Sequence, residues 1–207
     1  MTTTLKDLRG ISSGIEAVFF DCETGGFSPQ KNGLTEVAAV HFTIGPNGEL
    51  KRNSVYNRLI KPVQGKEYHP QALNVQNRTY YELSEQGEDY KEVIEGLHEY
   101  FVSVLGDNFE DWAGRIWAHN APFDHGFVLQ AYKEVMVVQP IPDRCNWSCT
   151  KSLATIMRGL GFNLPTASTN KALAEFFGVT TTGQHGALVD TKISIEVLSR
   201  LLHLVRG

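Results

Sequence analysis

The hydrophobic pattern of the chain changes its period near residue 90, and this change limits the folds that the chain can adopt. Before it, glycine-containing turns separate three segments rich in β-branched and aromatic residues, namely 15–22, 34–44 and 50–60. Beyond it, apolar residues recur every three or four positions from Tyr90 to Val104, and Gly106 is placed to end a helix. The sequence therefore predicts a meander of three antiparallel strands followed by alternating strands and helices.

The later part of the chain predicts two more strands and four more helices. The strands are 115–119 and 146–150, and the helices are 122–138, 151–158, 170–177 and 187–205. This order describes an α/β fold with a mixed sheet, in which three antiparallel strands are followed by parallel strands and helices cover both faces. With 207 residues and neither a linker nor a repeat, the chain fits one domain with its core at about 15–205.

The sequence contains no signal for export, membrane insertion or a disulfide framework. The first residues lack the apolar core of a secretory signal, and no window reaches 18 uncharged apolar residues, so we expect a cytoplasmic protein without a membrane segment. The three cysteines, Cys22, Cys145 and Cys149, have no usual zinc spacing and are expected to be reduced. A metal site that joins Cys145 and Cys149 to distant histidines stays open as a weaker alternative.

Two acids at the end of the first predicted strand, Asp21 and Glu23, flank Cys22. Alternate side chains of a strand share a face, so the two carboxylates project to one side and Cys22 to the other. Neighbouring carboxylates repel each other unless a cation lies between them, and oxygen ligands suit Mg²⁺ or Mn²⁺. Taken alone, the pair is more typical of two solvated acids at a strand end.

Two further groups of polar residues lie where predicted helices begin. Asp124 follows Pro122 at the start of a helix, where the helix dipole favours a negative charge. His185 lies in a loop before the last helix, and Asp190 lies in the first turns of that helix. Taken alone, Asp124 is typical of an acid at a helix N-terminus, and a histidine at a helix start is more often a cap or a surface group than a base.

In this order and placement, the three groups resemble the signature of the DEDDh exonucleases, the family of ribonuclease T, oligoribonuclease and the epsilon proofreading subunit of bacterial replicases. The similarity covers residues 17–202 and fills all five signature positions, which are Asp21, Glu23, Asp124, His185 and Asp190. Three other motifs look most like the ribonuclease T branch, namely Glu23-Thr24-Gly25-Gly26-Phe27, Pro70-Gln71-Ala72-Leu73-Asn74 and Asp124-His125-Gly126-Phe127. The resemblance implies a ribonuclease H-like fold and a 3′-to-5′ exonuclease that acts on single-stranded DNA or RNA and releases nucleoside 5′-monophosphates.

The resemblance also implies a mechanism and a set of substrate contacts. The four acids would hold two Mg²⁺ or Mn²⁺ ions, and His185 would act as the general base. The turn after the first strand would bring backbone N–H groups close to the terminal nucleotide, and aromatic rings would stack on bases. The implied substrate contacts are Thr24, Gly25, Phe27, Asn120 and Phe123, with Trp147 as a further candidate for stacking. For Phe123 a core role is the alternative, and the segment 73–75 lacks the phenylalanine of ribonuclease T.

A net charge of −4 argues against a partner as anionic as nucleic acid. The acids are concentrated, however, in the segment 82–111, which has ten acids and one base, whereas the rest of the chain carries +5. Such a segment is typical of the solvated face of an amphipathic helix. We therefore expect this acidic helix to lie away from the active-site face.

Two other classes of protein fit parts of the sequence. A degenerate family member that binds nucleic acid or a replicase subunit would usually have lost a signature residue, and all five are present. An unrelated hydrolase of small phosphoesters would need neither Phe27 nor a basic surface. Dimerisation is typical of the ribonuclease T branch, although the sequence identifies neither an interface nor a replicase partner.

Overall fold

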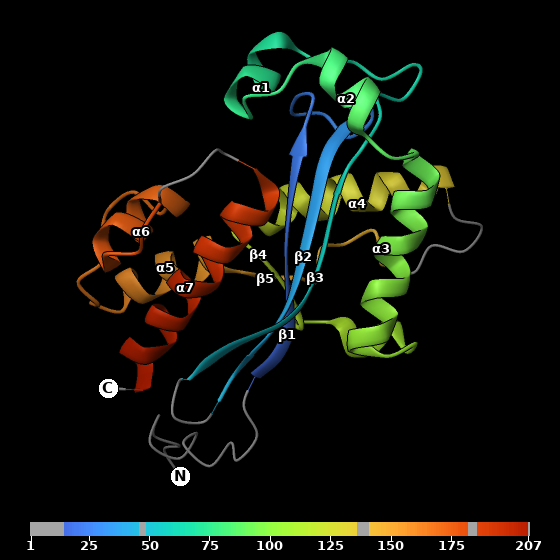
Figure 1. The fold of residues 1–207 in the computed structure, drawn as a ribbon. Coiled ribbons are helices and arrows are strands. Elements are labelled where there is room, and N and C mark those ends of the chain that lie inside the picture. Colours follow the sequence, from blue (N-terminus) through green and yellow to red (C-terminus); the bar gives the residue numbers. More distant parts are fainter. Residues whose placement is uncertain (1–14, 46–48, 136–140, 182–185, 207) are drawn as a thin grey trace.

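A computed structural model of the protein describes residues 15–45, 49–135, 141–181 and 186–206. Within these ranges, one mixed sheet has the strand order β3-β2-β1-β4-β5 (Figure 1). The strands β1, β2 and β3 are antiparallel, whereas β4 is parallel to β1 and β5 is parallel to β4. The strands are β1 (Ile15–Thr24), β2 (Leu34–Ile44), β3 (Leu50–Leu59), β4 (Ile116–Ala118) and β5 (Ser148–Cys149). The predicted α/β fold and its mixed sheet are confirmed.

Helices cover both faces of the sheet (Figure 1). On one face lie α3 (Tyr90–Leu105) and α4 (Ala121–Val135), and on the other lies α7 (Ala187–Arg206). Beside α7 are α5 (Thr150–Gly159) and α6 (Asn170–Phe177). These bounds agree with the predicted helices to within about two residues, apart from the predicted end of the second helix at 136–138, which lies outside the described residues. None of the helices in the described ranges combines the length and the apolar character needed to cross a membrane.

Two short helices, α1 (Pro70–Val75) and α2 (Tyr80–Gln86), were not predicted as elements. Their six and seven residues are too few for a clear helical period. The sequence nevertheless marks the start of α2, because Thr79 and Glu82 form a reciprocal capping box. Both helices lie over the carboxyl end of β1 (Figure 1).

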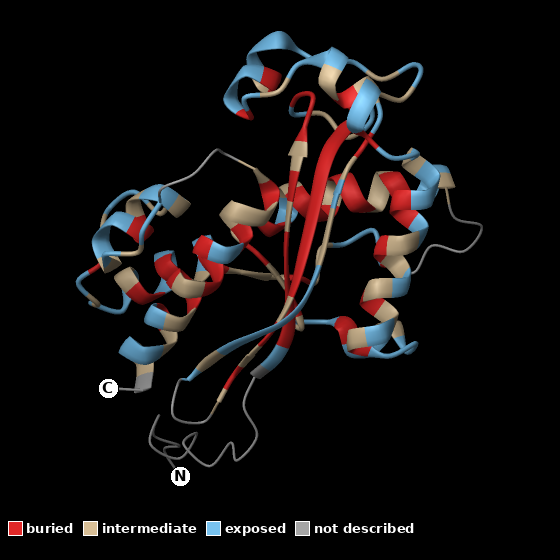
Figure 2. Ribbon diagram, viewed as in Figure 1, coloured by how far each residue is buried: buried red, intermediate tan, exposed pale blue. Residues whose placement is uncertain are grey.

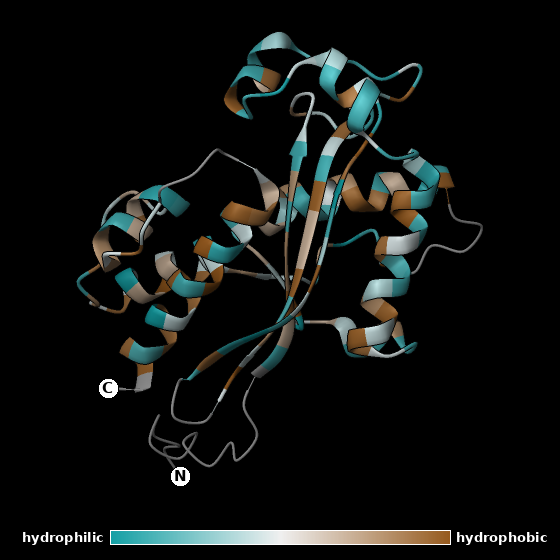
Figure 3. Cartoon of the chain, in the orientation of Figure 1, coloured by the Kyte–Doolittle hydropathy of each residue, from teal (hydrophilic) through white to brown (hydrophobic). Residues whose placement is uncertain are grey.

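The two faces of β1 belong to different parts of the hydrophobic core. Val18, Phe20 and Cys22 pack with α3 and α4, whereas Ala17 and Phe19 pack with α7. Both β1 and β2 are buried along most of their length (Figure 2), and β1 becomes hydrophilic at its carboxyl end (Figure 3). This polar end of a buried strand is where the candidate site begins.

Candidate active site

The carboxyl end of β1 and the first turn of α7 bring three carboxylates together. Asp21 and Glu23 lie on the same face of β1, and Asp190 lies one turn into α7. One carboxylate oxygen of each residue lies within 4.8 Å of those of the other two. In the described part of the chain, no other three His, Cys, Asp or Glu side chains form such a group. The alternative of a metal site around Cys145 and Cys149 therefore finds no support in the described residues.

Asp124 approaches β1 from the opposite face. It lies in the first turn of α4 and is 3% exposed. Its Oδ1 accepts a hydrogen bond from the Cys22 backbone N–H at 3.2 Å and lies 3.5 Å from the Cys22 Sγ. Asp124 is therefore held against the strand residue between Asp21 and Glu23, although it lies outside the group within 4.8 Å.

The electrostatics of these acids show an excess of negative charge. Burial raises the pKa of Asp21 well above its usual range, and the charges of Asp124, Glu23 and Asp190 raise it further. Burial, followed by the charges of Asp190, Glu36 and Asp124, raises the pKa of Glu23 to about 8. Burial also raises the pKa of Asp124 to about 7, although the hydrogen bonds from Cys22 oppose this shift.

The neighbours whose charges raise the pKa values of Asp21 and Glu23 are all carboxylates. Such a cluster favours protonation or a bound cation. Because its donors are carboxylate oxygens alone, it fits a hard divalent cation such as Mg²⁺ or Mn²⁺.

Known proteins resemble this chain along most of its length. The model of the exonuclease family RNase_T matches residues 18–198. The chain belongs to this exonuclease family. Among family members, the ribonuclease T of Marinobacter nauticus is 32% identical over 120 residues, which cover 57% of this chain and 53% of that protein. The ribonuclease T of Baumannia cicadellinicola is 26% identical over 207 residues, which cover 96% of this chain and 88% of that protein.

Solved structures share the fold of this exonuclease-family chain. Exonuclease I from Methylocaldum szegediense matches with a TM-score of 0.72 at 20% identity, over 91% of this chain and 40% of that chain. Exonuclease I from E. coli in complex with a dT13 oligonucleotide matches with a TM-score of 0.70 at 18% identity. The match covers 90% of this chain and 40% of that chain. The chain thus spans about half of the length of the Marinobacter ribonuclease T and less than half of the exonuclease I chains.

The turn that follows β1 in this family member differs from the expectation in one respect. The Gly25 N–H, expected to face a nucleotide, donates to the Gly33 carbonyl at 2.8 Å. A Cβ at Gly25 would lie 2.6 Å from the Glu67 carbonyl oxygen, so packing against the protein requires glycine at this position. The Thr24 side chain is also buried, and its hydroxyl donates to the Gly26 carbonyl at 2.6 Å. The backbone N–H of Gly25 and the hydroxyl of Thr24 therefore stabilise the turn itself.

The aromatic candidates have different degrees of burial. Phe27 is 91% exposed, whereas Phe123 is half-buried, with its ring centroid 5.0 Å from that of Phe127. Trp147 is buried between Phe20 and Phe101 in the core, so its expected role in stacking on a base is wrong. Phe27 thus has a solvent-exposed ring four residues after Glu23, whereas the Phe123 ring is partly covered by the core.

Two polar residues lie at the junction between β4 and α4. Asn120 is exposed, and its Oδ1 accepts from the Lys151 Nζ at 3.4 Å. The ring nitrogens of His119 lie 3.0 Å from the Thr150 hydroxyl and 3.0 Å from the Ser168 carbonyl oxygen. Burial lowers the pKa of His119 to about 4, so this imidazole is neutral at pH 7 and links elements of the fold. His185, the predicted general base, lies outside the described residues.

The acid-rich helix α3 lies at the far end of α4 from Asp124. The Tyr90 hydroxyl at the start of α3 donates to Glu134 Oε2 at 2.8 Å. Glu134 is ten residues beyond Asp124 in α4, which corresponds to about 15 Å along the helix. The prediction therefore agrees with the structure for α3 alone, because Glu82 and Glu85 of the same acidic segment belong to α2, which lies over the carboxyl end of β1 (Figure 1).

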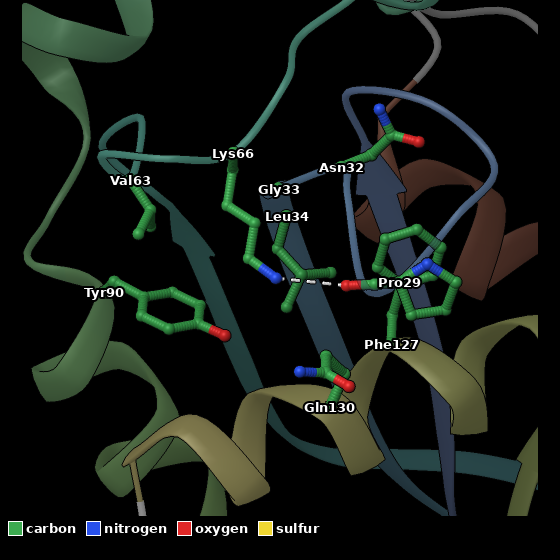
Figure 4. Close-up of a pocket in the computed structure, with 9 residues that line it drawn as sticks. All are labelled: Pro29, Asn32, Gly33, Leu34, Val63, Lys66, Tyr90, Phe127 and Gln130. Atoms are coloured by element: carbon green, nitrogen blue, oxygen red, sulfur yellow. Dashed lines mark hydrogen bonds between the residues drawn. The ribbon is translucent and has the colours of Figure 1, made fainter.

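Lys66 contacts the loop that contains Pro29, two residues after Phe27 (Figure 4). The Lys66 Nζ donates to the Pro29 carbonyl at 3.1 Å and to Glu134 Oε1 at 2.6 Å. Beside these contacts is a cavity of about 10 Å³, which has room for about one water molecule. A shallow groove of about 650 Å³ opens next to Lys66 and Tyr90. None of the candidate carboxylates lines either hollow.

Proposed function

We propose that this exonuclease-family chain is a divalent-metal-dependent 3′-to-5′ exonuclease of the DEDDh type. Its substrates would be the 3′ ends of single-stranded DNA or RNA, and its products nucleoside 5′-monophosphates. The observation that supports this proposal most is the cluster of Asp21, Glu23 and Asp190, whose neighbours include the buried Asp124. Carboxylate oxygens gathered in this way fit two divalent cations better than any single organic ligand.

The residues of the proposed site would have two tasks, which are metal binding and proton transfer. Asp21, Glu23, Asp124 and Asp190 would hold two Mg²⁺ or Mn²⁺ ions, which supply Lewis-acid charge at the scissile phosphate when they are bound. His185 would accept the proton of the attacking water. The bond from phosphorus to the 3′ oxygen of the shortened strand would break as the water oxygen bonds to phosphorus, and this 3′ oxygen would take up a proton from solvent. One nucleoside 5′-monophosphate and a shortened strand are the products.

A single-stranded substrate would be held largely by stacking and by contacts to its backbone. Phe27 would stack on a base near the 3′ end, because its exposed ring lies in the turn that follows Glu23. Phe123 and Asn120 would contact the same nucleotide from the start of α4. Two solved exonuclease I structures of the same fold hold oligonucleotides, and the relatives named above are ribonucleases T. A homodimer remains part of this proposal on the family resemblance alone, and a cytoplasmic location on the expectation from the sequence.

The test is digestion of 5′-labelled single-stranded DNA and RNA of matched sequence with Mg²⁺ and with Mn²⁺. We expect a ladder that shortens from the 3′ end one nucleotide at a time, and no ladder in EDTA. The Asp21→Asn variant, which has the same size without the charge, serves as the matched control and should give no ladder. Binding of the strand without cleavage by the wild type would favour the degenerate binding protein, and cleavage in EDTA would contradict the metal-dependent mechanism.

A further inference from the structure

A fifth carboxylate, Glu36, lies next to the cluster. It is on β2 directly opposite Glu23, in the otherwise apolar or uncharged run from Leu34 to Val40, and its residue is only 7% exposed. A buried carboxylate destabilises a fold unless hydrogen bonds or opposite charges compensate its lost hydration. The surroundings of Glu36 supply both.

The partners of Glu36 come from three separate elements. The first is the backbone of Ala187 at the start of α7, which lies close enough to the carboxylate to lower its pKa. The Asn57 side-chain amide of β3, with its nitrogen toward Glu36, donates to Oε1 at 3.0 Å. Burial raises the pKa of Glu36, and the positive charge of Arg78, which follows α1, opposes this shift together with Ala187 and Asn57.

Glu36 therefore differs from the other acids of the site. The charged groups that act on Asp21 and Glu23 are carboxylates. Those that act on Glu36 include the base Arg78, and the hydrogen-bonding groups of Ala187 and Asn57 also lower its pKa. The protein thus compensates part of the charge of Glu36, although burial and the charge of Asp190 leave its pKa raised. The burial of Glu36 is thus explained better by its contacts with protein groups than by a role as a further cation ligand.

The contacts of Glu36 act on the backbone next to Asp190. Ala187 precedes Asp190 by three residues, and the Asp190 N–H donates to the Gly186 carbonyl at 3.0 Å in the same turn. A Cβ at Gly186 would lie 3.3 Å from Glu36 Oε2, so this backbone passes close to the carboxylate. The carboxylate thus fixes the first turn of α7 to the strand opposite Glu23.

We propose that Glu36 is a positioning residue, which holds the first turn of α7 so that the Asp190 carboxylate meets those of Asp21 and Glu23. This inference rests on the proposed metal-dependent function. Residues that orient metal ligands without touching the metal typically change affinity by about 10–100-fold when they are replaced. The expected consequence of losing Glu36 is therefore weaker cation binding rather than loss of the reaction.

The test is calorimetric titration of the full chain with Mn²⁺, combined with the Mn²⁺ dependence of exonuclease rate. For Glu36→Ala we expect the Mn²⁺ dissociation constant and the Mn²⁺ concentration for half-maximal rate both to rise by about 10-fold or more. The rate at saturating Mn²⁺ should recover to within about 10-fold of the wild type. Glu36→Gln, which keeps the size and one acceptor oxygen for Ala187, should restore much of the affinity. Glu196→Ala, on the same helix in a partly exposed ion pair with Arg52, is the matched control and should bind Mn²⁺ like the wild type.

Two results would overturn the positioning role. One is wild-type Mn²⁺ affinity in Glu36→Ala, and the other is loss of binding in Glu36→Gln as complete as in Asp21→Asn, which would make Glu36 a ligand. If Glu36→Ala does not fold, the double variant Asn57→Ala with Arg78→Gln removes two partners of the carboxylate. That variant should weaken Mn²⁺ binding, and unchanged affinity would overturn the proposal.

The same titration separates this proposal from the proposed function. Wild-type protein that binds Mn²⁺ but cleaves no strand would refute the exonuclease activity and leave the affinity comparison as the test of Glu36. Wild-type protein that binds no Mn²⁺ would overturn both.

Discussion

The Cys22 backbone N–H donates to Asp124 Oδ1 at 3.2 Å, and this hydrogen bond joins residues that are 102 positions apart in the chain. It connects the carboxyl end of β1 to the first turn of α4. Because Asp21 and Glu23 alternate with Cys22, the strand presents two carboxylates on one face and fixes a third from the other face. Acids from distant parts of the sequence therefore converge on one strand end.

The backbone contact, rather than the thiol, should hold Asp124 in place. Cys22→Val removes the Sγ contact at 3.5 Å and keeps the N–H, and a thiol is a weak donor. We expect exonuclease activity in Cys22→Val to fall by less than about 10-fold, because one weak hydrogen bond is worth about 1 kcal/mol. Asp124→Asn should abolish activity. Equal losses in the two variants would show that the thiol is essential.

Removal of one clustered acid should separate activity from stability. Asp21→Ala should abolish exonuclease activity, while its melting temperature in EDTA equals or exceeds that of the wild type, because like charges repel when no metal is bound. Differential scanning calorimetry and the digestion assay check the two parts. Glu175→Ala, in a surface ion pair of α6, is a control that should change neither quantity. Wild-type turnover in Asp21→Ala would contradict the assignment.

The metal-free protein should become less stable as the pH rises. Glu23 has a folded pKa of about 8, raised by burial and by neighbouring acids, so the folded state binds its proton more tightly than the unfolded state does. The resulting stabilisation is fully present below the unfolded pKa, near 4.5, and is lost as the pH rises through about 8. In EDTA, the melting temperature should therefore fall between about pH 5 and pH 8, and by less in Glu23→Gln.

Added Mn²⁺ should reverse this loss at pH 8, because a cation stabilises the ionised carboxylates. A melting temperature with the same pH dependence in the wild type and in Glu23→Gln would contradict the raised pKa. No effect of Mn²⁺ at pH 8 would contradict the metal site.

Loss of the proposed general base should affect turnover more than metal binding. His185→Ala should lower the turnover number by about 100-fold or more, because a positioned base typically contributes about 10²–10⁴-fold. Calorimetric affinity for Mn²⁺ should stay close to that of the wild type. Collapse of Mn²⁺ binding in this variant would show that His185 is a ligand instead.

The two aromatic candidates should respond differently to truncation. Phe27→Ala should raise the KM for single-stranded substrates, since stacking on one base is worth about 1–3 kcal/mol. Its melting temperature should not change, because the ring is 91% exposed. Phe123→Ala should lower the melting temperature as well, since that ring packs against Phe127. Phe176→Ala, an exposed aromatic on α6, is the control, and an unchanged KM in Phe27→Ala would remove Phe27 from the substrate site.

The long elements and the carboxylates could be predicted from sequence because their signals are local. Helix α3 has Asp89 as its N-cap and ends at Gly106, whose φ of 89° favours glycine. Asp21 and Glu23 share a face because strand alternation requires it.

The features that sequence reasoning missed depend on contacts between distant segments. Glu36 became a candidate only when β2 was placed opposite Glu23, although an acid within an apolar strand was a visible signal. The role of Gly25 depends on the approach of Glu67 and Tyr68, and the burial of Trp147 depends on Phe20 and Phe101. No local pattern contains this information.

The most direct test of the central claim is a time course with 5′-labelled single-stranded DNA and RNA in Mn²⁺, run with the wild type and with Asp21→Asn. The two-cation carboxylate site predicts stepwise shortening from the 3′ end by the wild type, with nucleoside 5′-monophosphates as products, and no shortening by Asp21→Asn. Equal cleavage by both proteins, or internal cuts in place of a ladder, would contradict it.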